Sequence, residues 1–135
     1  MKNNKTKILI VEDNTDTRNN IIEFLLENSI NILGAGSIKE ATQIYKENAS
    51  DIKLFLIDLE LPDGNGMEFL KTIKDESNSS HLSQSPRPRG PKSIIISYFI
   101  NEDVRRIGKE LGVTGFIEKP FDLYELIKNV NSAIG

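Results

Sequence analysis

The sequence predicts a single α/β domain in which five strand–helix units build a doubly wound, parallel five-stranded sheet. Short apolar runs alternate five times with segments that carry apolar residues at helical spacing. The runs are apolar at nearly every position, which is typical of strands buried on both faces of a parallel sheet. Each crossover helix must pack back on that sheet, so helices are expected on both faces.

The first half of the chain shows the alternation clearly. Residues 7–12 are an apolar run that ends at Glu12 and is followed by Asp13, and they predict the first strand. Residues 15–29 carry apolar side chains at helical spacing and predict a helix. Residues 30–33 form a second apolar run. A Ser-x-x-Glu capping box then opens a helix over about 38–48.

The second half repeats the pattern. Leu54–Ile57 is a third buried strand that ends at Asp58, and a loop rich in proline and glycine follows it. The remaining predicted elements are a helix with apolar positions from Met67 to Ile73, a strand at 94–96, a helix from Val104 to Leu111 stopped by Gly112, a strand at 116–117 and a last helix capped by Asp122.

One segment interrupts this rhythm. Residues 77–92 are polar and contain three prolines, so they cannot bury an apolar face. We therefore expect residues 1–135 to form one domain, with a flexible polar insertion at about 77–92.

Composition excludes several classes of function. The net charge of −3 leaves no basic excess to bind a phosphate backbone, so direct nucleic-acid binding by this domain is not expected. The absence of cysteine excludes disulfides, a thiolate zinc site and a cysteine nucleophile. The apolar run near the N-terminus is too short for a secretion signal or a membrane span. These features predict a cytoplasmic protein without a membrane partner.

Polar side chains stand where the predicted strands end. The first strand ends in Glu12 and Asp13, the third in Asp58, the fourth in Ser97 and the fifth is followed by Lys119. Ligands of open parallel sheets bind beyond the carboxyl ends of the strands, and these ends share one edge. Three carboxylates, a hydroxyl and an ammonium are therefore expected in one crevice.

This set of groups suits phosphoryl transfer to a carboxylate. Neighbouring carboxylates repel one another, and a hard cation such as Mg²⁺ relieves that repulsion. An aspartate can act as a nucleophile and form an aspartyl-phosphate, while a lysine and a hydroxyl hold the phosphoryl oxygens. We predict Mg²⁺ as the cofactor.

The sequence resembles the receiver domain of bacterial two-component response regulators, the CheY-like family with a flavodoxin-like fold. The resemblance extends from Lys7 to about Ile134. It rests on four motifs in order: an apolar strand ending in Glu12-Asp13, Leu-Ile-Asp58-Leu-Glu-Leu-Pro62-Asp-Gly64-x-Gly66, Ile-Ile-Ile-Ser97, and Lys119-Pro120-Phe121. Each motif is weak alone, but together and in this order they are specific.

The resemblance implies a role for each matching residue. Asp58 would be the phosphoacceptor, assisted by Ser97 and Lys119. The Mg²⁺ ligands would be Glu12, Asp13, Asp58 and the backbone carbonyl of Glu60. Ser97 and Phe116 would form the switch, and the Lys119–Pro120 peptide would be cis.

The family also implies a function in a phosphorelay. A sensor histidine kinase or a phosphotransfer protein would donate the phosphoryl group. The face made by the fourth helix, fifth strand and fifth helix would then change shape, toward an output domain, a downstream protein or a homodimer. The domain would not be an enzyme beyond its own phosphorylation and dephosphorylation. The sequence leaves open whether an output domain follows Gly135.

One departure from the family pattern bears on how long the phosphoryl group lasts. Tyr98 follows the switch hydroxyl at a position where the family usually has a small side chain. Phe99 and Glu60 also flank the expected approach of water. We predict that these three residues modulate the phosphoryl lifetime.

Two alternatives remain from the sequence alone. The Asp-x-acid pattern of Asp58 and Glu60 resembles the start of haloacid-dehalogenase-like phosphatases, which also form an aspartyl-phosphate. The second acid there is Glu, and the motif lies on the third strand, both of which count against a phosphatase. A degenerate receiver that acts without phosphorylation is the other alternative, and the complete set of acids, hydroxyl and lysine counts against it.

Overall fold

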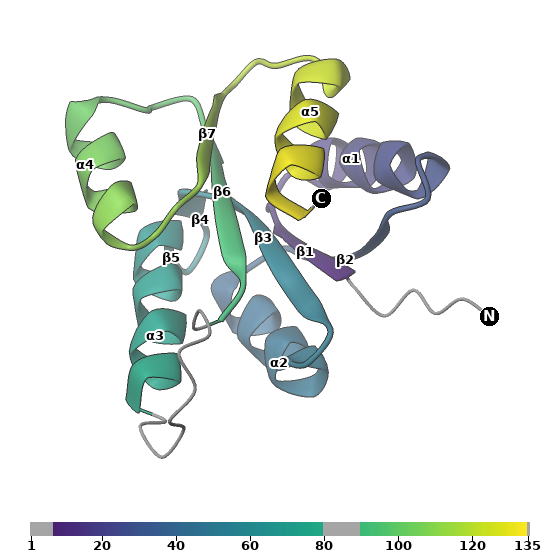
Figure 1. Ribbon diagram of the computed structural model, residues 1–135. Helices are drawn as coiled ribbons and strands as arrows, with labels where there is room; N and C mark the ends of the chain where they lie inside the picture. Colours follow the sequence, from purple (N-terminus) through teal and green to yellow (C-terminus); the bar gives the residue numbers. More distant parts are fainter. Residues whose placement is uncertain (1–6, 80–89, 135) are drawn as a thin grey trace.

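The computed structural model describes residues 7–79 and 90–134, which fold into one doubly wound α/β domain (Figure 1). Five parallel strands form the sheet in the order β2-β1-β3-β6-β7. These strands are β1 (Lys7–Val11), β2 (Asn31–Ala35), β3 (Ile52–Asp58), β6 (Lys92–Ser97) and β7 (Gly115–Glu118). The predicted fold class is confirmed.

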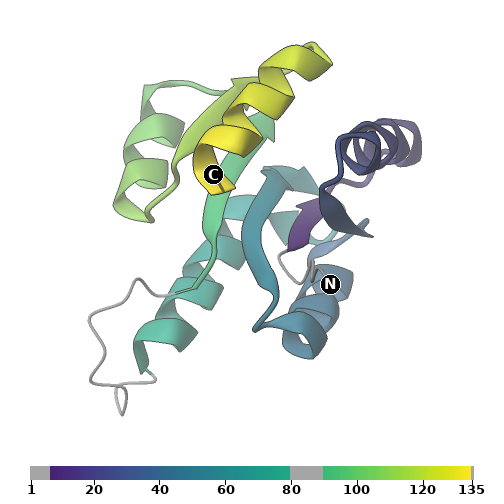
Figure 2. The ribbon, with the colours of Figure 1, turned by 45° about the vertical axis from the view of Figure 1, so that its right-hand side comes forward.

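Four helices connect the strands of this sheet, and a fifth follows β7. They are α1 (Thr15–Glu27), α2 (Ile38–Asn48), α3 (Gly66–Ser79), α4 (Glu102–Glu110) and α5 (Leu123–Ile134). Figures 1 and 2 show α1 and α5 on one side of the sheet and α2 and α3 on the other. Within the described residues, no helix is both long and apolar enough to cross a membrane.

Strand alternation divides the core into two layers. Leu9 and Val11 of β1 point to the side of α2 and α3, whereas Ile8 and Ile10 pack with α1 and α5. All four side chains are almost completely buried. Because both faces of the central strands are covered, the runs are apolar throughout rather than at every second position.

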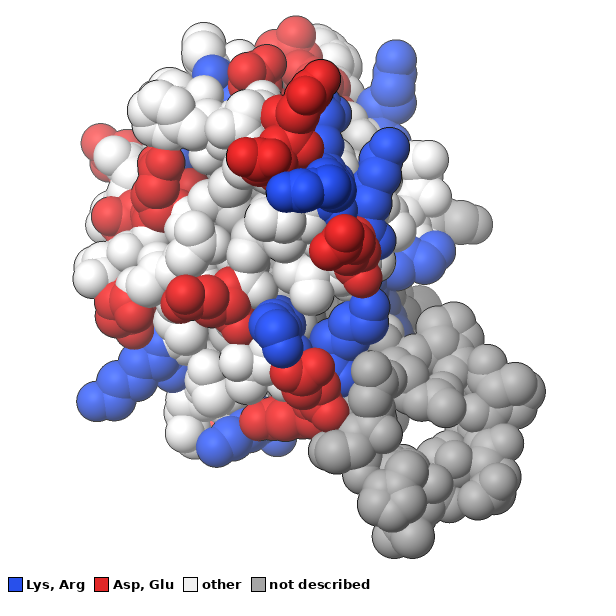
Figure 3. All heavy atoms as spheres, turned by 90° about the vertical axis from the view of Figure 1, so that its left-hand side faces the viewer, with Lys and Arg blue, Asp and Glu red and all other residues white. Residues whose placement is uncertain are grey.

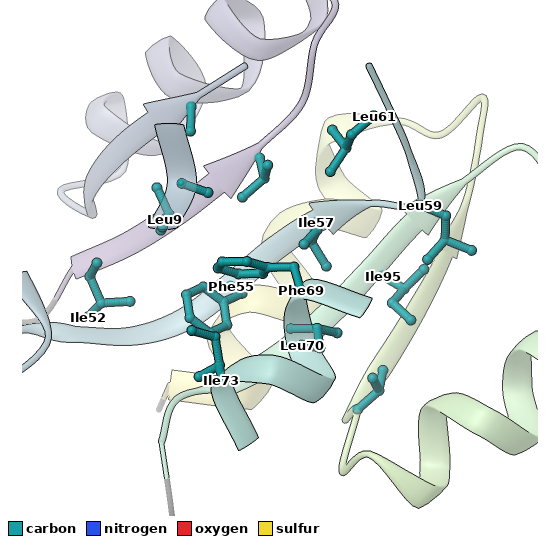
Figure 4. Close-up of a cluster of buried hydrophobic side chains, with 14 residues drawn as sticks. Leu9, Ile52, Phe55, Ile57, Leu59, Leu61, Phe69, Leu70, Ile73 and Ile95 are labelled. Carbon is teal, nitrogen blue, oxygen red and sulfur yellow. The ribbon is translucent and has the colours of Figure 1, made fainter. Parts of the chain in front are cut away.

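The layer beneath α2 and α3 is organised around Phe55 (Figure 4). The Phe55 ring packs edge-on against Tyr45 of α2 and Phe69 of α3, with centroids 5.4 and 5.3 Å apart. Aromatic pairs favour this edge-to-face arrangement. Strand β3, which ends at Asp58, is therefore held from both flanking helices.

The structure refines several predicted boundaries. Helix α1 ends at Glu27, two residues before the predicted end, where Ser29 adopts a left-handed φ of 64°. The loop predicted after Asp58 contains a small antiparallel hairpin of β4 (Glu60–Leu61) and β5 (Gly64–Asn65). Two-residue strands carry too little periodicity to be recognised from sequence.

Part of the predicted insertion belongs to regular elements. Helix α3 continues to Ser79, and β6 begins at Lys92. The sequence pattern missed the last helical turn because no apolar side chain marks it. Residues 80–89, the centre of the predicted insertion, lie outside the described residues.

Candidate functional site at the carboxyl edge of the sheet

Strand register brings the predicted site residues to one edge. Val11 pairs with Ile57, Asp58 with Ile96, and Ser97 with Glu118. The residues that end or follow these strands therefore lie at the same level of the sheet. An open hollow of about 570 Å³ lies at this edge. It is lined by Glu12, Asp13, Asn14, Thr15, Thr17, Asp58, Glu60, Tyr98 and Lys119.

Helix α1 holds the acidic turn after β1. Asn14 caps this helix by accepting a 2.8 Å hydrogen bond from the Thr17 amide, and its own amide donates to Glu12 Oε2 at 3.0 Å. Arg18 Nη1 donates to the Glu12 carbonyl oxygen at 2.6 Å. These contacts fix Glu12 in a buried position and leave the neighbouring Asp13 exposed.

The Asp58 carboxylate is also held from both oxygens. Oδ1 accepts a hydrogen bond from the Glu60 amide at 3.1 Å, and Oδ2 accepts one from Lys119 Nζ at 3.0 Å. The side chain is 7% exposed. Burial of a carboxylate demands such partners, because an unpaired buried charge is costly.

Lys119 connects three strand ends. Its Nζ lies 2.8 Å from Glu12 Oε1 and 3.0 Å from Asp58 Oδ2, and its amide donates to the Ser97 carbonyl at 2.8 Å. The side chain is only 10% exposed. The peptide to Pro120 is cis, as predicted.

The pKa values of Glu12 and Lys119 reflect both their burial and their charged neighbours. Burial raises the pKa of the Glu12 carboxyl above its ordinary value, although the bonds from Lys119 and the Asn14 amide act in the other direction. Burial alone would lower the pKa of Lys119, but its bonds to Glu12 and Asp58 raise it overall. Lys119 is therefore firmly cationic, and it offsets the two buried carboxylates.

The donor set fits a hard cation. One carboxylate oxygen from each of Glu12, Asp13 and Asp58 lies within 4.8 Å of the others. Oxygen ligands on a partly open site are what Mg²⁺ prefers, because it keeps several waters. The three predicted acidic ligands are thus together, and Glu60 lines the same hollow.

Ser97 and Phe116 are not among the residues that line the hollow. Ser97 is fully buried, and its Oγ accepts a 3.0 Å hydrogen bond from the Phe99 amide. The half-buried Phe116 ring packs closely against Gly108 of α4, since a Cβ added to Gly108 would lie 2.6 Å from Phe116 Cζ. The Arg105 guanidinium lies over the same ring, 5.3 Å from its centroid.

Two aromatic rings stand at the mouth of the site. Tyr98 is 58% exposed and lines the hollow, with Lys119 Nζ 5.3 Å from its ring centroid. Phe99 is 66% exposed, and its ring lies 6.5 Å from that of Tyr98. Of the three predicted lifetime residues, Tyr98 and Glu60 thus border the hollow directly.

Sequence reasoning missed two supporting residues. Asn14 directly precedes a helix, and such an asparagine is a recognisable N-cap signal. Arg18 carries no comparable signal, since its bond to the Glu12 carbonyl depends on how α1 leaves the sheet.

Comparison with known proteins agrees with this geometry. Residues 8–131 match the family model described as the response regulator receiver domain. The transcriptional regulatory protein YcbL of Bacillus subtilis is 29% identical over 127 residues, 93% of this chain and 50% of that protein. The polar-differentiation response regulator DivK of Brucella ovis is 25% identical over 95% of both chains.

A solved structure agrees as well. The non-phosphorylated HemR receiver domain of Leptospira biflexa superposes with a TM-score of 0.81 at 28% identity, covering 96% of this chain and 94% of that one. The chain spans about half the length of YcbL and nearly all of DivK. Relatives of both lengths therefore share this domain.

The position of Lys119 leads to a first prediction. Lys119→Met removes the cation between two buried carboxylates, so we expect the free energy of unfolding to fall by about 3 kcal/mol. Urea denaturation in the presence of a chelator measures it. Lys71→Met is the matched control, because Lys71 pairs with Asp75 on the surface at 66% and 62% exposure. An exposed pair contributes little, so equal losses in both variants would contradict this account.

Proposed function

The chain belongs to the response regulator receiver domain family of two-component signalling, and we propose that Asp58 is its phosphoacceptor. The observation that carries the proposal is the meeting of Asp58 with Glu12, Asp13 and Lys119 in one hollow. The domain is a signalling module rather than a classical enzyme. Its chemistry is limited to gaining and losing its own phosphoryl group.

The proposed reaction is a displacement at phosphorus. An oxygen of the Asp58 carboxylate attacks the phosphorus atom of a phosphohistidine and forms a new P–O bond. The bond from phosphorus to the imidazole nitrogen breaks, and that nitrogen keeps the electron pair. A sensor histidine kinase or a phosphotransfer protein is the proposed donor. The Glu60 amide and Lys119 hold the carboxylate in place beforehand.

Mg²⁺ is the proposed cofactor. Glu12, Asp13, Asp58 and the backbone carbonyl of Glu60 would hold it, and when bound it offsets the negative charge of the phosphoryl oxygens. The Lys119 ammonium and the Ser97 hydroxyl are the chain's own groups for those oxygens. Lys119 already reaches Asp58, whereas Ser97 is fully buried and does not line the hollow.

A phosphatase of the haloacid-dehalogenase type is not favoured. The family model covers residues 8–131 and describes a receiver. A degenerate receiver is not favoured either, because Asp58, Lys119 and the acidic cluster are all present and in contact. A cytoplasmic location and the lack of membrane or nucleic-acid partners remain part of the proposal. It also includes an output domain, a downstream protein or a homodimer as the recipient of the signal.

The proposed switch links Ser97 to Phe116. A phosphoryl group on Asp58 would draw the Ser97 hydroxyl toward it by a charge-assisted hydrogen bond. The Phe116 ring, now seated against Gly108 and under Arg105, would turn into the vacated space. That turn would remove the ring from α4 and reshape the surface of α4, β7 and α5. Figure 3 shows acidic and basic side chains interspersed on the side of the molecule that carries α4.

In this proposal, residues at the mouth of the hollow determine how long the phosphoryl group remains on Asp58. Tyr98 stands beside Lys119 at the edge of the hollow, so its ring would cover part of the path by which water reaches the phosphorus. The Phe99 ring lies beside that of Tyr98, and Glu60 also lines the hollow.

Phosphorylation of Asp58 is the central test. Acetyl phosphate with Mg²⁺ should add one base-labile phosphoryl group, and intact-mass measurement with peptide mapping should place it on Asp58. We expect Asp58→Asn to abolish labelling, because it removes the nucleophile. Chelation and Asp13→Ala should reduce labelling strongly, because the first removes Mg²⁺ and the second removes one of its proposed ligands. Label that persists on another residue in Asp58→Asn would disprove the assignment.

The switch makes a spectroscopic prediction. Beryllofluoride, in place of the phosphoryl group, should shift the NMR resonances of residues 97–119 far more than those of α1. Ser97→Ala should leave Asp58 able to bind beryllofluoride but suppress this response. Gly108→Ala should move the free protein part of the way to the activated spectrum, because its Cβ overlaps the seated ring. An unchanged response in Ser97→Ala would rule out this coupling.

Tyr98 makes a kinetic prediction. Tyr98→Ala should hasten autodephosphorylation up to about tenfold, which requires only about 1.4 kcal/mol of barrier. Decay of the phosphorylated protein after removal of the donor measures the rate. Phe99→Ala is measured for comparison and should have a smaller effect, because Phe99 flanks Tyr98 but does not line the hollow. If Tyr98→Ala decays no faster than wild type, the ring does not shield the phosphoryl group.

A further inference from the structure

The hairpin after Asp58 is tied to a distant helix by a single side chain. Asp63, at the tip between β4 and β5, accepts hydrogen bonds from the amides of Ile38 and Lys39 at 2.8 and 2.9 Å. Each carboxylate oxygen takes one amide. The two amides belong to the first turn of α2 and lie 25 and 24 residues away in sequence.

Helix α2 does not need Asp63 in order to begin. Ser37 Oγ already accepts from the Glu40 amide at 3.1 Å, and Glu40 Oε1 accepts from the Gly36 amide at 2.7 Å. This local cap resembles the predicted capping box, with the Glu arm reaching Gly36 instead of Ser37. Asp63 is therefore a second cap, supplied by a loop. Its two hydrogen bonds hold the hairpin in place as well as capping the helix.

The link is charge-assisted. The two backbone hydrogen bonds hold the pKa of the Asp63 carboxyl below its ordinary value, even though the group is exposed to solvent. The carboxylate therefore stays ionised at neutral pH, and negative charge is favourable at a helix N-terminus. Hydrogen bonds to an ionised acceptor are stronger than neutral ones.

The hairpin also packs closely on both of its neighbours. A Cβ at Gly64 would lie 2.9 Å from Ile38 Cδ1, so the hairpin rests directly on the first residue of α2. At the base of the hairpin, a Cβ at Gly66 would overlap the Asp58 carbonyl oxygen. The hairpin thus spans the distance from α2 to the backbone of Asp58 without room for a side chain at either end.

Glu60 lies within this clamped segment. Its amide donates to Asp58 Oδ1 at 3.1 Å, and it pairs with Asn65 across the hairpin. Under the proposed function, its carbonyl is also a metal ligand. A shift of the hairpin would therefore move the Glu60 amide, which orients the Asp58 carboxylate, together with the Glu60 carbonyl.

We propose that Asp63 is a positioning residue for phosphoryl transfer, which fixes the β4–β5 hairpin to α2 so that Glu60 stays aligned with Asp58. The inference rests on the proposed function for its chemical consequence. Its geometric part, the alignment of Glu60, can be measured without phosphorylation. Asp63 touches neither Asp58 nor the metal ligands in any described contact.

Three variants separate positioning from simple helix capping. Asp63→Ala removes both bonds to α2. Ser37→Ala removes the local cap from the same helix end but leaves the hairpin untouched. Asp63→Asn keeps an acceptor oxygen without the charge. Each Ala variant should lower the melting temperature by a few degrees, about 4 °C, because each removes one cap.

Two further measurements should distinguish the Ala variants. Amide hydrogen exchange of Glu60, measured by NMR in a chelator, should accelerate about tenfold in Asp63→Ala and stay unchanged in Ser37→Ala. Mg²⁺ affinity of the unphosphorylated protein, measured by titration calorimetry, should fall about fivefold in Asp63→Ala only. Asp63→Asn should lie between Asp63→Ala and wild type in both measurements.

The Glu60 exchange rates and Mg²⁺ affinities of the two Ala variants decide between positioning and simple helix capping. If Asp63→Ala and Ser37→Ala show the same Glu60 exchange or the same Mg²⁺ affinity, Asp63 is a helix cap only and the proposal is overturned. Should Asp63→Ala fail to fold, the same comparison is made between Asp63→Asn and Ser37→Ala. Failure of wild type to be labelled on Asp58 would instead refute the proposed function, and the Glu60 exchange would still decide the positioning role.

Discussion

The ammonium of Lys119 lies between two carboxylates that the sheet buries at its carboxyl edge. Glu12 follows β1, Asp58 ends β3 and Lys119 follows β7, so one cation joins strands from the centre and the edge of the sheet. Two buried negative charges at this range would repel strongly in a medium of low dielectric. The arrangement persists because the lysine offsets them, and both carboxylates line the hollow together with Asp13.

That electrostatic centre depends on the apolar layers beneath it. Strand β3 runs through the middle of the sheet and is buried on both faces, with Phe55 locked between aromatic rings of α2 and α3. Close packing of this kind resists displacement, since moving one side chain requires its neighbours to move. Asp58 is thus presented from a rigid strand, while the proposed switch residues lie on β6, which ends at Ser97, and on the edge strand β7, which carries Phe116.

Around this centre, a second set of contacts aligns the backbone. Arg18 fixes the carbonyl of Glu12 from α1, and Asp63 fixes the β4–β5 hairpin to α2. Both are single side chains that connect a loop of the site to the helix beside it. On the other side, Phe116 leans on Gly108 of α4. Contacts from α1 and α2 therefore hold the site in place, and the proposed conformational change is transmitted to α4.

The sequence by itself determined the order of elements and the chemistry at the strand ends. Apolar runs are local patterns, and parallel strands necessarily end at one edge, so Glu12, Asp58 and Lys119 could be assigned to one crevice without coordinates. Ser97 was assigned there as well, but it is fully buried and does not line the hollow. Local rules also predicted the caps made by Ser37 and Asp122, whose partners lie three residues away.

Only the tertiary structure decided the contacts between distant segments. Asp63 capping α2 joins residues 25 apart, and the Lys119–Glu12 pair joins residues 107 apart. No local period encodes such pairs, because they depend on the angles at which helices leave the sheet. The rotamer of Tyr98, which places its ring beside Lys119, and the seat of Phe116 on Gly108 were settled in the same way, by packing between elements that the sequence specifies only one at a time.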